Sequence, residues 1–424
     1  MNKTHPNKSK HFEVTVKSIG VRGDGIANGV GERYFVPYSV PGDRLSITVK
    51  ESRKGAQFAK IEKIITPSES RTDPECPHFS TCGGCALQHV HTDAIASVKR
   101  GFLENALKNR NLPTDTLQPT VKIVPGLRRR VRFAVRKQKG VMLGFFEPRS
   151  KQIVNIEECP AVQPAIADLI DPLRNLIASI RAIGRAATVL VTASDSGVDM
   201  LLHPETESDL TLEDREAFAH FANTYDLARI AWHGPFGPEP VAQRREPRHR
   251  FGTVTVAPPL NAFLQPSKEG EDTIAATASR ALHGAQRIAD LYAGCGALTF
   301  PFSSIAPTHA FEGDAEMGAA IKRAAGNHPV TAHARDLAHM PLTVPELNQF
   351  DAVVFDPPRA GAKSQAAALA GSSVRTIVAV SCNPRTLARD LSLLIDGGYT
   401  LQSVLPIDQF PWSPHVETVA VLRR

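Results

Sequence analysis

IADLYAGCGALTF, residues 288–300, decides the fold, because in it an apolar strand runs directly into a glycine turn. Glycines at the end of a strand let the backbone approach a ligand closely at the carboxyl edge of a sheet. Residues 256–424, which contain this stretch, alternate between apolar strands and helical or loop segments. Such alternation is typical of a doubly wound parallel sheet, so we expect a Rossmann-like α/β fold for this part of the chain.

The expected strands of this sheet lie at residues 287–292, 308–311, 330–332, 350–355 and 375–380. Two further apolar segments, TLQSVLPID and HVETVAVLRR, are separated by a short loop. A short loop predicts that these two strands pair antiparallel. In contrast, residues 11–67 hold several short strands with glycine turns, which predict a small β-barrel.

Acidic residues accompany the glycine turn at the spacing of a nucleoside-binding site. Glu312 ends the next strand, where a carboxylate can accept hydrogen bonds from ribose hydroxyls, and Asp336 follows the third strand. A dinucleotide or S-adenosylmethionine fits this arrangement, and a bare strand–helix turn is the alternative. Thr299 replaces the third glycine of GxGxxG, and Asp290 precedes Gly294 by four residues, as in the DxxxGxG order of class I methyltransferases. Both details favour S-adenosylmethionine.

RTIVAVSCNPRTLARDL, residues 375–391, predicts a strand, a turn and a helix around Cys382. Asn383 is a favoured helix N-cap and Pro384 a favoured first helical residue. Because Cys382 then lies at the amino end of a helix, we expect its thiol pKa to be lowered and its thiolate to be available. A cysteine buried as a small hydrophobic residue is the alternative, but the strand-end position favours a nucleophile.

A thiolate suits methylation at carbon 5 of uracil, which is too weakly nucleophilic to take a methyl group directly. Addition at carbon 6 gives an enolate whose carbon 5 can attack a sulfonium methyl group, and a base must then remove the proton at carbon 5. Glu417, in PHVET, is the candidate base, with an exposed strand-end glutamate as the alternative. Asp356, in FDPPRAGA, follows the fourth strand on a rigid turn suited to contacting cofactor or base. A DPP sequence also occurs in methyltransferases that act on amino groups.

Four of the six cysteines form a separate pattern, Cys76-x5-Cys82-x2-Cys85 followed by Cys159 in ECP. Zinc and a 4Fe-4S cluster both take four cysteine ligands. The glycine pair between Cys82 and Cys85 favours a wrapped cofactor over scattered core cysteines. The spacing favours iron–sulfur slightly over zinc.

Composition and charge are compatible with RNA as a partner. The net charge of +6 and a pI near 9.0 permit a polyanion. RRVRFAVRK alternates basic with apolar residues, so we expect the arginines at 128–136 to form a row that holds RNA, with a solvated strand face as the alternative. The basic start, MNKTHPNKSKHF, has no apolar stretch behind it and no apolar run is long enough to cross a bilayer, so a cytoplasmic protein is expected.

Together these residues resemble the RNA uracil-5-methyltransferase family, and most closely its RumA-like 23S ribosomal RNA branch. The motifs that carry the resemblance are, in order, CPHFSTCGGCALQH, ECP, DLYAGCGALTF, FEGD, DPPRAGA, SCNPRTLARD and PHVET. The resemblance implies a multidomain chain: a TRAM-like OB-type β-barrel that binds RNA at residues 1–68, a mixed α/β central domain with an iron–sulfur site at 69–255, and a methyltransferase domain dependent on S-adenosylmethionine at 256–424.

The resemblance also implies a set of site residues. Cys382 would be the nucleophile and Glu417 the base. The cofactor or the base pocket would involve Gln265, Tyr292, Gly294, Gly296, Glu312, Asp336 and Asp356. A 4Fe-4S cluster would be bound by Cys76, Cys82, Cys85 and Cys159. The sequence departs from the family at Ala297, where members often have Asn, and at Asp336, where some have Asn.

The implied activity is methylation of carbon 5 of a uridine in 23S ribosomal RNA, by a monomer that needs no membrane. The target base would be flipped out or taken from an unpaired loop. The tRNA-specific branch usually lacks the barrel and the cysteine segment, so their presence favours ribosomal RNA over tRNA. The residues are also compatible with a methyltransferase of amino groups on RNA bases, for which Cys382 is dispensable, and with a non-catalytic iron–sulfur or zinc protein that binds RNA.

Overall fold

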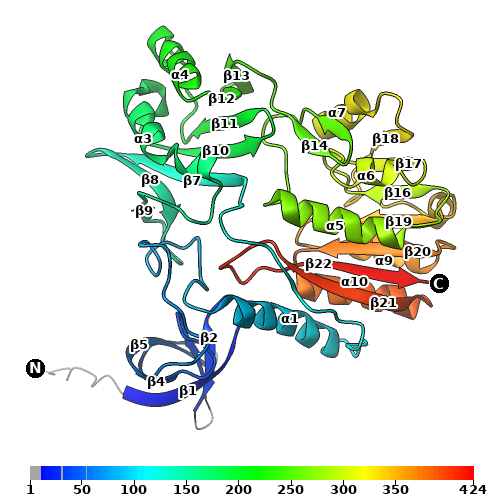
Figure 1. Cartoon of the computed structure of the whole chain (residues 1–424), viewed down its shortest axis with the longest axis horizontal. Coiled ribbons are helices and arrows are strands. Elements are labelled where there is room, and N and C mark those ends of the chain that lie inside the picture. Colours follow the sequence, from blue (N-terminus) through cyan, green and yellow to red (C-terminus); the bar gives the residue numbers. More distant parts are fainter. Residues whose placement is uncertain (1–10, 30–31, 54) are drawn as a thin grey trace, which may run out of the picture.

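The computed structural model of the chain describes residues 11–29, 32–53 and 55–424. Residues 1–10, which hold most of the basic amino-terminal segment, lie outside the described residues. A β-barrel and a strongly twisted sheet lie at opposite ends of one side of the molecule, and a second sheet with helices on both faces lies beside them (Figure 1).

The barrel closes in the strand order β1-β2-β3-β5-β4. Its strands are β1 (His11–Ile19), β2 (Gly25–Asn28), β3 (Arg33–Val36), β4 (Arg44–Arg53) and β5 (Ala56–Thr66). Alternate residues such as Val14, Val16, Leu45 and Ile47 fill its interior, as the period of two in a strand requires. The predicted small barrel is therefore confirmed.

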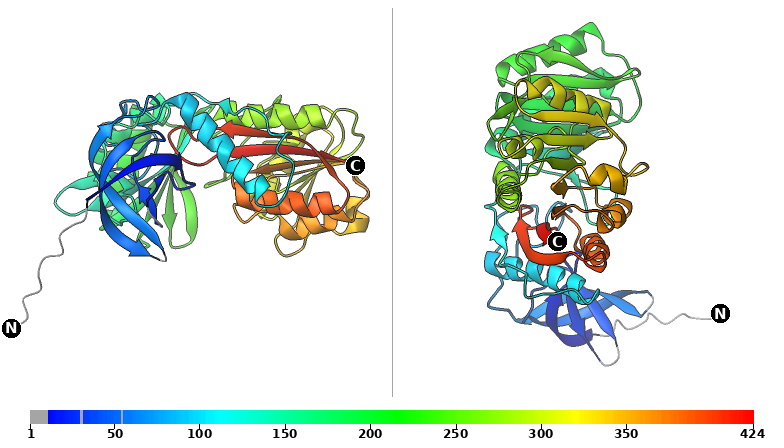
Figure 2. Two further views of the ribbon diagram at one scale, coloured as in Figure 1. Left: turned by 90° about the horizontal axis from the view of Figure 1, so that it is seen from below. Right: turned by 90° about the vertical axis from the view of Figure 1, so that its right-hand side faces the viewer.

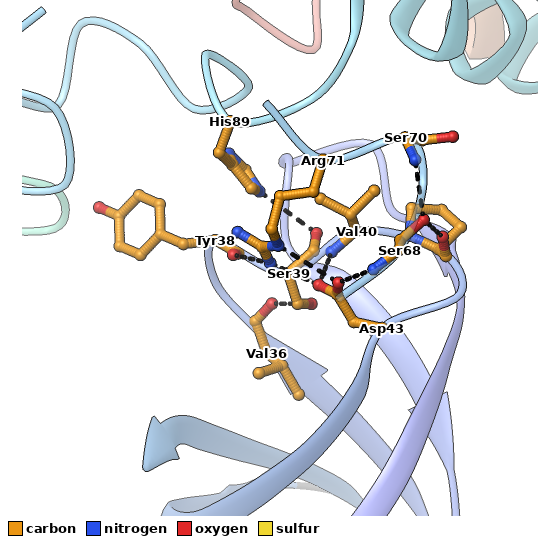
Figure 3. A network of polar contacts seen from close by, with 10 residues as sticks. Val36, Tyr38, Ser39, Val40, Asp43, Ser68, Ser70, Arg71 and His89 are labelled. Atoms are coloured by element: carbon orange, nitrogen blue, oxygen red, sulfur yellow. Dashed lines mark hydrogen bonds and ion pairs between the residues drawn. The ribbon is translucent and has the colours of Figure 1, made fainter. Parts of the chain in front are cut away.

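A network of polar contacts fastens the barrel to the cysteine segment, residues 71–90 (Figure 3). The buried carboxylate of Asp43 accepts hydrogen bonds from the backbone N–H groups of Val40 (2.7 Å) and Ser68 (2.9 Å) and pairs with Arg71. Arg71 also donates to the Tyr38 carbonyl at 3.1 Å. Burial raises the pKa of Asp43, but the hydrogen bonds from Arg71, Ser68 and Val40 outweigh burial, so the net pKa is lowered.

The central sheet has the strand order β13-β12-β11-β10-β7-β8-β9. Its strands are β7 (Arg130–Lys137), β8 (Val141–Phe146), β9 (Ile153–Asn155), β10 (Ala186–Ser194), β11 (Gly197–Pro204), β12 (Arg229–Gly234) and β13 (Gly237–Gln243). One face packs on α2 (Pro164–Ala167), α3 (Ile170–Ser179), η1 (Arg181–Ile183) and α4 (Leu212–Thr224). Val131, Phe133 and Val135 of β7 belong to this core, so the alternating Arg130 and Arg132 face the other way.

The third sheet has the order β18-β17-β16-β19-β20-β22-β21-β6. Its strands are β6 (Val121–Lys122), β16 (Ile288–Leu291), β17 (Thr308–Glu312), β18 (Val330–Ala334), β19 (Ala352–Phe355), β20 (Thr376–Ser381), β21 (Thr400–Asp408) and β22 (Glu417–Arg423). Strands β16 to β20 are parallel, whereas β22 is antiparallel to both β20 and β21. The predicted parallel strands and the predicted antiparallel pair are confirmed.

Helices cover both faces of this sheet, which explains why its strands are apolar on both sides. One face packs on α1 (Thr92–Lys108), α9 (Lys363–Ala370) and α10 (Pro384–Asp396), and the other on α5 (Lys268–Ala281) and α6 (Thr299–Ser303). Shorter elements complete the fold: α7 (Ala315–Ala325), α8 (Val344–Leu347) and the ribbon of β14 (His249–Phe251) with β15 (Val254–Val256). Both α1 and β6 come from the segment predicted as the central domain, and the domain boundaries stay a prediction.

Candidate active site

The residues predicted as nucleophile and base, Cys382 and Glu417, meet at the carboxyl end of β20. Ser381 at the end of β20 pairs with Thr418 of β22, so Cys382 and Glu417 follow at the same end of these two strands. Asn383 caps α10, since its side-chain oxygen accepts the backbone N–H of Arg385 at 3.2 Å. The predicted strand–cap–helix order around Cys382 is therefore confirmed.

Glu417 is buried, with 3% of its surface exposed, so the exposed strand-end alternative is wrong. The side-chain amide of Gln409 donates to Glu417 Oε2 at 2.9 Å and to Gln265 Oε1 at 2.7 Å. Gln265 in turn donates to Asp356 Oδ2 at 3.0 Å. The structure thus joins three predicted residues, Gln265, Asp356 and Glu417, in one buried chain of hydrogen bonds.

Burial opposes ionisation of the acids in this chain of hydrogen bonds and of the neighbouring Cys382 thiol. Burial raises the pKa of Asp356 to about 7, and the pKa of Glu417 is raised well above its usual value by burial and by the Asp356 carboxylate. The pKa of Cys382 is raised to about 11 by burial and then by the charges of Glu417 and Asp356. The expected lowering of the thiol pKa is therefore wrong for the ligand-free site, because burial and two neighbouring carboxylates outweigh the helix terminus.

The glycine turn is held by the acid that was predicted to accompany it. The Gly294 N–H donates to Glu312 Oε2 at 2.7 Å, and the Asp314 N–H donates to Glu312 Oε1 at 2.8 Å. Each carboxylate oxygen keeps a second lone pair for a ligand. Gly296 has a φ of 90°, and a Cβ there would lie 2.7 Å from the Phe300 ring, so only glycine fits.

Thr299 has a role that its place in the glycine pattern did not reveal. Its hydroxyl donates to Asp290 Oδ2 at 2.5 Å, beneath the glycine turn. Burial raises the pKa of Asp290 to about 7, and this hydrogen bond opposes the rise. Asp290 and Asp356 are therefore two acids of raised pKa in neighbouring segments of the sheet.

Tyr292 and Asp336 lie at the rim of the site. Tyr292 follows β16 in a left-handed conformation, with φ of 63°, and burial raises its pKa to about 12 with contributions from Asp390 and Asp336. The Asp336 side chain is 52% exposed and bonds within its own loop, to the Ala338 N–H at 3.0 Å and to His339 Nδ1 at 2.7 Å. The structure does not join Asp336 to the buried chain of hydrogen bonds.

The arginines predicted as one row at 128–136 lie in three different surroundings. Arg129 is buried: it pairs with Glu271 of α5 and donates to the Gln265 carbonyl at 3.0 Å. Arg128 lines the cavity that holds the cysteines. Arg130 and Arg132 face the open side of the central sheet, where both donate to Asn261. A surface row is therefore wrong for Arg129, which holds the backbone of the Gln265 loop.

The four predicted cysteines line one cavity of about 70 Å3. Cys76, Cys82, Cys85 and Cys159 all have free thiols, and burial raises the pKa of each, that of Cys85 to about 11. Gly83 passes so close to β8 that a Cβ would lie 2.7 Å from the Phe146 carbonyl oxygen, which explains this glycine. Within the described ranges, no three His, Cys, Asp or Glu side chains are grouped to hold a single metal ion.

In the part of the chain that the structure describes, no helix is both long and apolar enough to span a membrane.

Comparisons with known proteins agree with this geometry. Residues 332–424 match the family model described as tRNA (Uracil-5-)-methyltransferase. An uncharacterized RNA methyltransferase of Mesorhizobium japonicum is 40% identical over 413 residues, which cover 96% of this chain and 97% of that protein. The 23S rRNA (uracil(1939)-C(5))-methyltransferase RlmD of Bordetella bronchiseptica is 32% identical, over 96% of this chain and 92% of that protein.

A solved structure shares the fold over nearly the whole chain. The tRNA (uracil-54, C5)-methyltransferase of Pyrococcus abyssi, in complex with S-adenosyl-L-homocysteine, matches with a TM-score of 0.72 and 23% identity, over 97% of this chain and 100% of that one. With the full-length relatives above, the chain belongs to the family of RNA uracil-5-methyltransferases.

Proposed function

We propose that this enzyme methylates carbon 5 of a uridine in 23S ribosomal RNA, with Cys382 as nucleophile, Glu417 as base and S-adenosylmethionine as methyl donor. The observation that carries the proposal is the pairing of β20 with β22, which brings the Cys382 thiol and the Glu417 carboxyl to one strand end. The charge of Glu417 is also among the causes that raise the pKa of Cys382, after burial.

The buried acids suit a cationic methyl donor. S-adenosylmethionine supplies an electrophilic methyl group on a positively charged sulfur. Asp290 and Glu417 are buried, and Gln265 and Gln409 link Asp356 to Glu417 by hydrogen bonds. A charge on these acids therefore acts through a medium of low dielectric constant. A sulfonium cation bound there would lower the pKa values of these acids and of the Cys382 thiol, and would thereby favour the carboxylates and the thiolate.

The proposed reaction uses both carbon atoms of the uracil double bond. The Cys382 thiolate forms a bond to carbon 6, the resulting enolate takes the methyl group at carbon 5, and S-adenosylhomocysteine leaves. Glu417 then removes the proton from carbon 5, the double bond re-forms and Cys382 departs as a thiolate. Gln409 binds Glu417 Oε2, while Oε1 is buried without a partner among the described residues and is free to take the proton.

Ribosomal RNA is proposed as the substrate because the Bordetella relative that acts on 23S rRNA aligns along nearly all of this chain. The amino-terminal barrel, proposed to be a TRAM domain, and the cysteine cavity fit the same assignment. The test is release of tritium from RNA labelled at carbon 5 of uracil, with 23S rRNA and tRNA as matched substrates. Release from 23S rRNA is expected; release from tRNA alone would move the proposal to the tRNA branch.

Two variants separate this mechanism from methylation of an amino group. Cys382→Ala should abolish both tritium release and methyl transfer, because no other group activates carbon 5. Glu417→Gln should accumulate a covalent RNA–protein complex that survives denaturing electrophoresis, because elimination of the cysteine needs the base. Methyl transfer that survives Cys382→Ala would support a methyltransferase that acts on amino groups.

We also propose that the four cysteines bind a 4Fe-4S cluster. Each cysteine of such a cluster binds a different iron, so the thiolates stand around a cavity, as Cys76, Cys82, Cys85 and Cys159 do. An anaerobic preparation should be brown and contain about four irons per chain. Cys159→Ser should lose the iron, whereas Cys295→Ser, at a cysteine buried elsewhere, should keep it. One zinc per chain in place of iron would contradict the cluster.

A further inference from the structure

Residues 409–416 form the loop between β21 and β22, and Glu417 follows them directly. Figure 1 shows this loop reaching from the ends of the two strands toward the side of the molecule where the cysteine segment lies. Gln409, which holds Glu417 Oε2, is the first residue of the loop. The loop therefore positions Glu417 in two ways: its last residue precedes Glu417 in the chain, and its first residue, Gln409, binds the Glu417 carboxyl group.

Backbone contacts join the 409–416 loop to the cysteine segment. The Trp412 carbonyl oxygen accepts hydrogen bonds from the N–H groups of Ala86 (2.8 Å) and Leu87 (2.9 Å), the two residues after Cys85. The Trp412 side chain is 6% exposed and packs with Leu87 and Phe102. These contacts attach the middle of the loop to the residues that directly follow Cys85.

Arg128 makes a second connection, from the opposite side of the cavity. Its side chain lines the four-cysteine cavity, and its guanidinium carbon lies 5.9 Å from the centre of the Phe410 ring. Burial lowers its pKa, while the charges of Cys85 and Cys159 raise it. Within the described ranges no recorded ion pair joins Arg128 to a carboxylate, and Cys85 and Cys159, which line the same cavity, are the groups whose negative charge would act on it.

We propose that Arg128 is a positioning residue that couples the four-cysteine site to the 409–416 loop and thereby holds Glu417 in place. The proposal rests on the function assigned above to Glu417. When the site binds its cluster, four thiolates supply the negative charge that a half-buried guanidinium needs. When iron is removed, Arg128 loses that counter-charge, turns toward water and no longer lies over Phe410.

The first test compares the full chain loaded with iron and sulfide under anaerobic conditions with the same chain after removal of iron by a chelator. Amide hydrogen exchange is followed in peptides that cover 85–88 and 409–417. We expect removal of iron to speed exchange about tenfold in both peptides. The reason is that the contact of Arg128 with the Phe410 ring is lost and the hydrogen bonds of the Trp412 carbonyl oxygen are weakened. Exchange in the barrel strand β4 serves as the internal reference.

The second test separates Arg128 from the cysteines. Arg128→Gln should keep its iron but show fast exchange at 409–417, and Phe410→Leu should do the same without altering the cavity. Arg128→Lys keeps the charge and should restore part of the protection. Arg287→Gln is the matched control, because Arg287 lies 5.2 Å from the centre of the Phe350 ring and neither residue lines the four-cysteine cavity.

Catalysis supplies an independent measurement. In Arg128→Gln the maximal rate of tritium release should fall about tenfold while the RNA concentration for half-maximal rate changes less than about twofold, since the base is displaced and RNA contacts are kept. Fast exchange in both the depleted chain and Arg128→Gln supports the coupling even if the RNA assay fails. Unchanged exchange at 409–417 after loss of iron overturns it, even where methylation proceeds.

Discussion

The Cys382 thiol lies among groups that oppose its ionisation, although its place at the start of α10 predicted the opposite. Asn383 takes the first free amide of the helix with its own side chain, and the carboxylates of Glu417 and Asp356 raise the thiol pKa together with burial. A thiol with so high a pKa is mostly protonated at neutral pH and reacts slowly with oxidants, and we expect a cation in the site to favour its thiolate. The helix terminus was readable from the sequence, whereas the carboxylates on two other strands were not.

The rate at which iodoacetamide alkylates Cys382 should report this environment. In the ligand-free protein the rate should rise with pH toward the thiol pKa of about 11, because the thiolate is the reacting form. Glu417→Gln removes a negative neighbour and should shift the profile to lower pH. S-adenosylmethionine should shift it further, whereas S-adenosylhomocysteine, whose sulfur is neutral, should not.

Peptide mass spectrometry reads Cys382 separately from the other cysteines. The claim that Glu417 and Asp356 raise the thiol pKa would be contradicted if the alkylation rate of Cys382 depended on pH with a pKa near the usual value of about 8.5 and Glu417→Gln left that dependence unchanged.

Residue identity allowed some of the site to be predicted and not the rest. Cys382 and Glu417 stand in motifs whose chemistry can be inferred from residue type and order. Gln409 lies in a loop without periodicity, and its importance arises because it reaches Gln265 and Glu417 from separate segments. Arg129 looked like one of a surface row, and only its contact with Glu271 shows that it is buried.

At the scale of elements, the barrel and the cysteine segment are joined by the ion pair of Arg71 with Asp43, in which the carboxylate is fully buried and the guanidinium is 19% exposed. Removing one partner leaves the other charge without compensation. Asp43→Asn should therefore lower the free energy of unfolding by about 3 kcal/mol, measured by urea denaturation at pH 7. Glu13→Gln is the control, because its pair with Arg44 is exposed on both sides and should cost under about 1 kcal/mol.

The same pair predicts a pH dependence. The folded pKa of Asp43 is lowered, so its contribution is present above the unfolded carboxyl pKa of about 3.9 and is lost as the pH falls through the lower folded value. The difference between wild type and Asp43→Asn should shrink below about pH 4. A difference that grows on acidification would show that the carboxylate is not the stabilising form.

Strands with continuous apolar runs were predicted to within about two residues, because burial on both faces leaves little freedom in where they begin and end. Strand character was predicted around the two-residue strand β6, but its place in this sheet was not. It joins the sheet through its parallel pairing with Ile407 and Asp408 of β21. So short an edge strand has no period, and tertiary contact alone creates it.

At the scale of the molecule, the barrel and the central sheet lie at opposite ends of the view in the right-hand part of Figure 2, with the methyltransferase sheet between them. The open face of the central sheet carries Arg130 and Arg132, and both contact Asn261, four residues before Gln265. A strand of RNA that enters the site from this side would meet positive charge before reaching the buried chain of hydrogen bonds.

Arg132→Ala should weaken RNA binding at low salt and reduce the dependence of log affinity on log salt concentration by about one unit, since one phosphate contact is lost. Filter binding between low and moderate salt measures the slope. Arg215→Ala is the matched control, because Glu239 pairs with that exposed arginine at 3.2 Å and the slope should not change. Equal slopes for wild type and Arg132→Ala would remove this face from the RNA path.

Strand β22 follows β21 in the chain, yet it lies between β20 and β21 in the sheet. During synthesis on the ribosome, residues 400–408 therefore emerge before the strand that they must pair with exists. Until residues 417–423 insert, β20 presents an unpaired apolar edge, and Cys382, the proposed nucleophile, lacks Glu417, its proposed base. We therefore expect activity only after β22 has inserted into the sheet. A nascent chain stalled before residue 417 would be inactive, and its unpaired β20 edge would be prone to aggregation unless a chaperone covers it.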